Sequence, residues 1–106
     1  MTTFDDREKA FEEKYKHNQD LQFKVEVRRS KLLGLWAAEL LGLQGREAEA
    51  YAKEVVACDF DEPGDADLVR KVLGDISAKQ VEMSEHRLRK KLQELQVEAK
   101  HQIMTE

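Results

Sequence analysis

The chain has 106 residues and a formal net charge of −4 at pH 7. That length is typical of one domain, and the negative balance argues against nucleic acid as the main partner. No apolar run approaches the roughly 20 residues of a membrane span, and the acidic first residues do not resemble a signal peptide. Charged residues make up 38% of the chain, which has one proline and five glycines, so the composition favours a soluble and highly helical protein.

The first 19 residues differ in pattern from the rest of the chain. Phe4, Phe11 and Tyr15 stand among charged residues, and two acid-before-base pairs at i,i+4 spacing each support a helix by about 0.2–0.5 kcal/mol. That support is small, because an isolated helix of this length is marginal in water. We therefore expect residues 1–19 to be a mobile arm, disordered or frayed when free and helical in the groove of a partner. A solvated extension of the first helix, without a role of its own, is the alternative.

Apolar residues recur at helical spacing in four later segments that short connections join. The pattern predicts an all-α protein, a four-helix bundle over residues 20–106 with the flexible arm in front of it. The helices are expected at about 20–41, 44–60, 66–79 and 84–104.

The first bundle helix holds the only tryptophan and the densest run of leucine, and we expect it at the centre of the bundle. Its apolar stripe is predicted to run through Leu21, Val25, Leu32, Trp36 and Leu40, widened by Leu33, Ala37 and Leu41. Gly34 costs about 1 kcal/mol relative to alanine inside a helix, so a neighbour that packs closely over that turn would explain it.

The other three helices each show an apolar face. The predicted inward residues are Ala48, Tyr51, Ala52, Val55, Val56 and Phe60 in the second helix, Leu68, Val69, Val72, Leu73 and Ile76 in the third, and Leu88, Leu92, Leu95, Ala99 and Ile103 in the fourth. Three capping signals accompany them. Gly42 should end the first helix in a left-handed cap with Leu43 as its hydrophobic contact, Asp65 should cap the third helix, and Ser84 the fourth.

Two basic groups are interpreted as solvated faces rather than anion sites. They are Lys24, Arg28, Arg29 and Lys31 in the first bundle helix, and His86, Arg87, Arg89, Lys90 and Lys91 in the fourth.

The sequence contains no pattern typical of catalysis, metal binding or cofactor binding. His17, His86 and His101 have no partner at metal-ligand spacing, and no glycine-rich phosphate loop occurs. Cys58 is interpreted as a small core residue rather than a nucleophile, and as the single cysteine it favours a reducing compartment. One acidic cluster lacks the order of a calcium loop and is interpreted as capping and solubilising. Its members are Asp59, Asp61, Glu62, Asp65 and Asp67. We therefore expect a protein that is not an enzyme.

Four stretches, residues 3–12, 29–39, 50–56 and 60–65, carry a family resemblance. They closely resemble the ζ subunit of the F-type ATP synthase of α-proteobacteria, and the likeness covers nearly the whole chain in register. It implies a four-helix bundle with an N-terminal inhibitory arm and a non-enzymatic inhibitor of ATP hydrolysis. In this family the arm inserts as a helix at a catalytic α/β interface near the γ stalk. The implied location is cytoplasmic, peripheral to the inner membrane through the synthase.

Carried onto this chain, the resemblance places the arm at about residues 1–18. It implies that Phe4, Phe11 and Tyr15 are apolar anchors for the α, β and γ subunits of the catalytic head. The implied polar contacts are Asp5, Arg7, Lys9, Glu12 and Lys16. Two other functions stay open: a small regulatory module whose basic turns bind ADP or ATP, although no phosphate loop supports it, and a generic helical adaptor.

Overall fold

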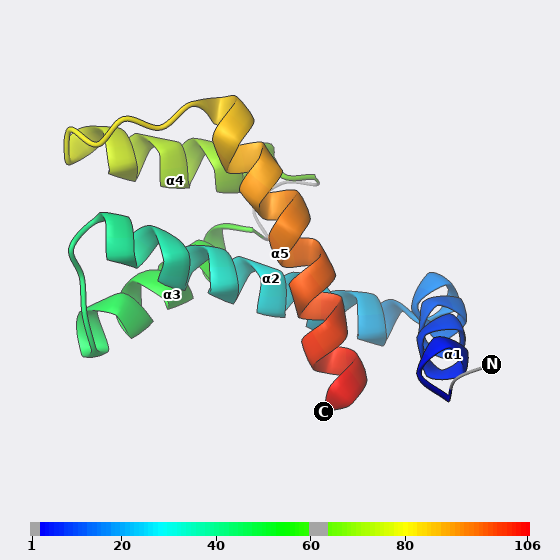
Figure 1. The fold of residues 1–106 in the computed structure, drawn as a ribbon. Coiled ribbons are helices and arrows are strands. Elements are labelled where there is room, and N and C mark those ends of the chain that lie inside the picture. The colour runs from blue at the N-terminus through cyan, green and yellow to red at the C-terminus, as the bar shows by residue number, and fades with distance from the viewer. Residues whose placement is uncertain (1–2, 60–63) are drawn as a thin grey trace.

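The structure, a computed structural model, describes the backbone of residues 3–59 and 64–106 and the side chains of residues 6–59 and 64–106. These residues form five helices and no strand (Figure 1). The helices are α1 (Thr3–His17), α2 (Gln19–Leu40), α3 (Arg46–Cys58), α4 (Ala66–Ala78) and α5 (Glu85–Thr105). The all-α prediction is confirmed. The expected flexible arm instead forms a fifth helix, which contacts α2 and, through Glu12 and Tyr15, α5. No helix in the described ranges is long and apolar enough to cross a membrane.

The helices are arranged around α2. It packs most extensively against α3 and next against α5, while α4 contacts α2, α3 and α5. Figure 1 shows α3 running beside α2 and α5 crossing α2, with α1 at the far end of α2. The central position expected for this helix is therefore confirmed.

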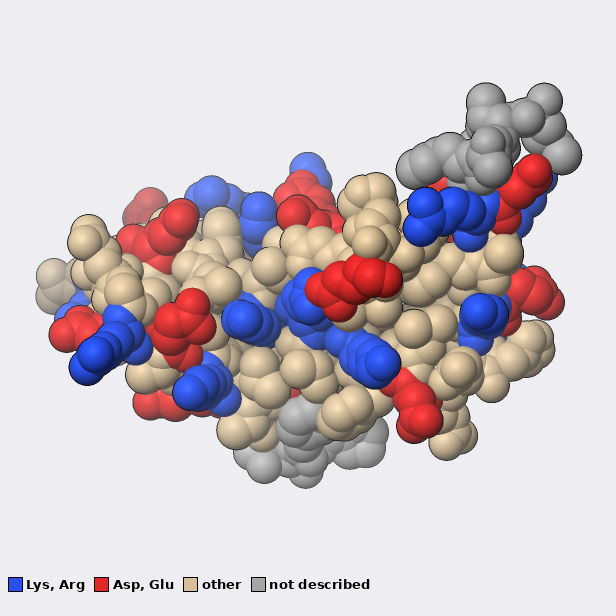
Figure 2. All heavy atoms as spheres, turned by 90° about the horizontal axis from the view of Figure 1, so that it is seen from below, with Lys and Arg blue, Asp and Glu red and all other residues tan. Residues whose placement is uncertain are grey.

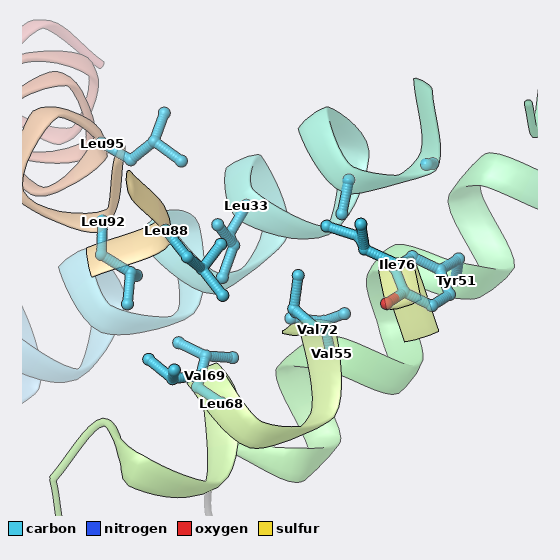
Figure 3. Close-up of a cluster of buried hydrophobic side chains, with 12 residues drawn as sticks. Leu33, Tyr51, Val55, Leu68, Val69, Val72, Ile76, Leu88, Leu92 and Leu95 are labelled. Atoms are coloured by element: carbon cyan, nitrogen blue, oxygen red, sulfur yellow. The ribbon is translucent and has the colours of Figure 1, made fainter. Parts of the chain in front are cut away.

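The core is a cluster of apolar side chains from α2 to α5 (Figure 3). Its fully or nearly fully buried members are Leu33, Ala37, Ala38, Tyr51, Val55, Leu68, Val69, Val72, Ile76, Leu88, Leu92 and Leu95. The inward faces predicted for α4 and α5 are thus correct, with Leu73 and Ile103 only partly buried. Phe60, predicted for the second bundle helix, lies outside the described residues. Among the side chains that the structure describes, none from α1 belongs to this cluster.

The buried face of α2 includes Val25, Leu33 and Ala37 as predicted, but it is rotated toward the side of the alanines. Leu33, Ala37 and Ala38 are fully buried, whereas Leu32, Trp36 and Leu40 are only partly buried at the edge of the core. The reason is the close approach of α3 to the small-residue side of α2. Large leucines flank that side, so the sequence pattern alone does not distinguish the two registers.

Gly34 lies where α3 comes closest to α2. A Cβ added at Gly34 would stand 2.6 Å from the Cα of Ala52, closer than real Cβ atoms approach. The predicted close neighbour is therefore confirmed, and it is the backbone of α3.

Two of the three predicted caps are confirmed. Gly42 has φ +76°, and Leu43 N–H donates to the Ala38 carbonyl at 2.9 Å, as a left-handed helix end requires. Ser84 Oγ accepts from Arg87 N–H at 3.1 Å. Asp65 occupies the predicted N-cap position of α4, but its side chain makes no capping bond, because Arg29 of α2 binds its carboxylate instead, at 2.8 Å.

Candidate functional site

Helix α1, the segment predicted to be the working part, is joined to α2 through one residue. Asn18 caps α2, and its Oδ1 accepts from Leu21 N–H at 3.0 Å. The side chain of Gln22 donates through Nε2 to the Tyr15 carbonyl at 2.8 Å. A carbonyl in the last turn of a helix lacks a hydrogen-bond partner within the helix, so Gln22 supplies a donor that the last turn of α1 otherwise lacks. These two polar side chains fix the direction in which α1 leaves the bundle.

One side of α1 contacts α5. Gln96 Nε2 donates to the hydroxyl oxygen of Tyr15 at 3.1 Å. Lys100 Nζ lies 4.2 Å from the centroid of the Tyr15 ring and 3.6 Å from Glu12 Oε2. The rings of Phe11 and Tyr15 are stacked, with centroids 6.3 Å apart and an interplanar angle of 22°. Three predicted site residues, Phe11, Glu12 and Tyr15, therefore gather on the side of α1 that faces α5.

The predicted site residues differ in exposure. Phe11, Glu12 and Tyr15, on the side of α1 that faces α5, are half-buried. The exposed members of the predicted set are Arg7, Lys9 and Lys16. The side chains of Phe4 and Asp5 lie outside the described residues. Sequence reasoning missed Gln96 and Lys100, since nothing local in α5 marks them as partners of a segment about 80 residues away.

Arg29, predicted to be solvated, forms a buried polar network. Its Nη2 donates to Asp65 Oδ1 at 2.8 Å and lies 3.9 Å from Asp59 Oδ2. Asp59 also accepts from Ser30 Oγ at 2.8 Å. Only 12% of the Arg29 side chain and 5% of the Asp59 side chain are exposed. The interpretation of Arg29 as part of a solvated face is therefore wrong, because buried charges require partners and the α3–α4 connection supplies them.

The acidic residues around this connection are engaged as far as the structure describes them. Asp59 and Asp65 contact Arg29, and Asp67 accepts from Arg70 at 3.0 Å. Asp61 and Glu62 lie outside the described residues. Elsewhere in the described ranges, no group of three or more His, Cys, Asp or Glu side chains could hold a metal ion.

A second polar cluster joins α3 and α4. The Tyr51 hydroxyl donates to Asp75 Oδ2 at 2.8 Å, and Lys71 Nζ lies 3.2 Å from the same oxygen and 3.4 Å from Glu54. Burial, reinforced by the hydrogen bond and charge of Asp75, raises the pKa of Tyr51 far above its ordinary value. Burial alone would lower the pKa of Lys71, but Asp75 and Glu54 raise it overall. Tyr51 therefore stays a protonated donor, which serves structure rather than proton transfer.

The basic side chains at the start of α5 face solvent, with one exception. His86, Arg87, Arg89 and Lys90 are exposed, whereas Lys91 lies 5.6 Å from the centroid of the Trp36 ring. Figure 2 shows basic and acidic side chains interspersed over the face seen from below.

The comparisons with known proteins agree with the stated resemblance. A family model described as ATPase inhibitor subunit zeta matches residues 1–102. The chain is also similar to a protein solved by solution NMR, with 52% identity and a TM-score of 0.72 over 80% of this chain and 96% of that chain. A comparison with curated proteins finds no match. Because the family model spans nearly the whole chain, the protein belongs to the ATPase inhibitor subunit zeta family, whose members are non-enzymatic regulators of the F-type ATPase.

Proposed function

We propose that this protein inhibits ATP hydrolysis by the F-type ATP synthase by inserting α1 at a catalytic α/β interface near the γ stalk. The observation that carries the proposal is the position of α1. It is a 15-residue helix whose described side chains lie outside the core cluster, at one end of the molecule (Figure 1). A helix placed in this way can leave the bundle without opening the core.

The contacts that hold α1 on α5 are weak enough to be exchanged for contacts with a partner. The Lys100–Glu12 pair is partly exposed, with side-chain exposures of 26% and 43%, and pairs of this kind contribute about 0–1 kcal/mol. The Gln96–Tyr15 hydrogen bond contributes about 1 kcal/mol and the Lys100–Tyr15 cation–π contact about 0.5–1 kcal/mol. A catalytic interface that buries both rings of Phe11 and Tyr15 would compensate for this loss.

A helix formed before binding also lowers the cost of association. A disordered segment must be ordered as it binds, whereas the residues of α1 already form a helix on the bundle, so a groove of the partner would replace the contacts with α5 and keep the same backbone. In this proposal Phe4, Phe11 and Tyr15 are the apolar anchors. The polar contacts to the α, β and γ subunits come from Asp5, Arg7, Lys9, Glu12 and Lys16. The protein would act on the cytoplasmic side, attached to the inner membrane only through the synthase.

The test is removal of residues 2–18. We expect the truncated protein to lose inhibition of ATP hydrolysis by the isolated catalytic head and to keep the helical circular dichroism and dispersed amide spectrum of α2–α5, since the core cluster is intact. A full-length Lys53→Ala variant is the control, because Lys53 is an exposed residue of α3 far from α1 in sequence. Inhibition by the folded truncated protein at full-length potency would exclude α1 as the inhibitory segment.

A further inference from the structure

We infer that the groove between α1 and α5 binds an amphipathic helix of a partner protein, one whose apolar stripe is flanked by lysine or arginine. The inference goes beyond the proposed inhibition, because the groove exists while α1 lies on α5 and needs no release of α1.

The groove has a volume of about 670 Å³ and is built from both helices. Its apolar lining is Phe11 from α1 with Val97 and Met104 from α5. Val97 is 69% exposed, and within the described residues only Phe23 is a comparably exposed large apolar side chain. Phe11 and Met104 are partly buried beside it. The chain's own packing thus leaves Val97 uncovered next to two further apolar groups, which is an arrangement that a partner side chain can fill.

The charges around the groove are mostly negative. The acidic residues that line it are Glu8, Glu12, Glu94 and Glu98, and the basic ones are Lys100 and His101. Lys100 is already engaged by Glu12 and by the ring of Tyr15. Glu94 lies 3.8 Å from Lys91, and Glu98 accepts a hydrogen bond from Gln102. Four carboxylates still outnumber these two lysines, so the rim is negative and suits cations of a partner, and complementary charge sets both the choice of partner and the rate of association.

The shape of the groove favours a helix as its occupant. Both of its walls are helices, whose backbone hydrogen bonds are formed internally, so no open sheet edge is available for an extended peptide. An amphipathic helix lying in an apolar groove between helices is a common mode of recognition, with apolar residues at i, i+3 or i+4 and i+7 as anchors. Phe11, Val97 and Met104 would receive these anchors, and the glutamates would face the flanking cations.

The experiment uses the isotope-labelled full-length chain and a synthetic peptide of roughly four helical turns, with leucines at i, i+4, i+7 and i+11 and lysines on both flanks. A matched peptide carries glutamate in place of every lysine. We expect the basic peptide to shift amide signals of residues 8–12 and 94–104, with about tenfold higher affinity than the acidic peptide and weaker binding at high salt. Equal affinity of the two peptides, or shifts located on other helices, would overturn the inference.

Three variants separate the groove from general charge attraction. Glu94→Gln combined with Glu98→Gln should weaken binding of the basic peptide by about fivefold or more. Glu47→Gln with Glu49→Gln removes the same charge from exposed positions of α3 and should leave the affinity unchanged. Val97→Lys should also weaken binding while the melting temperature stays the same, since Val97 is exposed. If both double variants weaken binding equally, the basic peptide senses only net charge and the groove is not its site. The ATP synthase is absent from these assays, so their result is independent of the proposed inhibition.

Discussion

Tyr51 is the residue through which pH should act on stability. Burial and Asp75 raise its pKa in the folded chain, whereas the pKa of a tyrosine in an unfolded chain is about 10. Above that pH the unfolded state loses a proton that the folded state keeps, so the contribution of Tyr51 to stability is complete below about pH 10 and falls as pH rises. The expected loss approaches about 1.4 kcal/mol per pH unit.

Urea unfolding at a series of pH values between 8 and 11 measures this effect. Tyr51→Phe should lower stability at pH 8, because it removes the hydrogen bond to Asp75, but its stability should decline less steeply above about pH 10. Both proteins keep Lys71, whose raised pKa also adds stability that is lost at high pH. Lys71 therefore contributes to the decline of stability with pH in both proteins. Identical slopes in the two proteins would show that Tyr51 ionises as readily in the folded chain as in the unfolded one.

Arg29 and Ser84 show which features of single residues can be predicted from the sequence and which cannot. Arg29 stands in a run with Arg28 and Lys31 that looks uniformly basic, yet only Arg29 is almost buried against Asp59 and Asp65. Its partners lie 30 and 36 residues along the chain, so the pairing depends on how α3 and α4 pack. Ser84, by contrast, acts on an N–H three residues away, and this local cap was predictable.

At the scale of helices, two glycines in helix interiors should respond to alanine in opposite directions. Gly34→Ala forces a Cβ to within 2.6 Å of the α3 backbone, so we expect a loss of about 1–3 kcal/mol in the free energy of unfolding. A Cβ at Gly74 in α4 meets nothing within 4 Å, so Gly74→Ala should gain up to about 1 kcal/mol through helix propensity. Denaturant midpoints of the two variants against the unchanged protein measure both effects.

Each glycine variant serves as the control for the other, since the chemical change is the same. Stabilisation by Gly34→Ala would mean that α2 and α3 are not in close backbone contact. Destabilisation by Gly74→Ala would mean that the exposed face of α4 carries a constraint beyond helix propensity.

The same contrast explains which features of the helices could be predicted. Gly34 and the Gly42 cap are local signals with a clear physical cost, and the structure agrees with both. The rotation of α2 could not be predicted, because leucines lie on both sides of its alanines and only the position of α3 selects the buried face. The order of α1 could not be predicted from the sequence either, because its helical propensity is marginal and its contacts with Gln96 and Lys100 are long-range.

At the scale of the whole molecule, α1 stands apart from the unit formed by α2–α5. Its described side chains contribute nothing to the core cluster, and its contacts with α5 are polar or partly exposed. Regions with few buried apolar contacts open at much lower free energy than the core, so α1 should open while the rest of the molecule stays folded. This separation would let one chain carry both a stable body and a segment available to the ATPase.

Lys100→Gln should make this opening easier to measure. It removes the ion pair to Glu12 and the cation–π contact with Tyr15, together about 1 kcal/mol, so amide hydrogen exchange in α1 should be about fivefold faster. Amide exchange in α2–α4 should not change, because both interactions that are removed join Lys100 to residues of α1. Lys91→Gln likewise removes one cation–π contact, with Trp36, and one ion pair, with Glu94, and is the matched control, with no effect expected on α1. If inhibition requires release of α1 from α5, the Lys100→Gln variant should also inhibit ATP hydrolysis at a lower concentration than the unchanged protein. Faster exchange in α1 without any gain in potency would show that release of α1 does not limit inhibition.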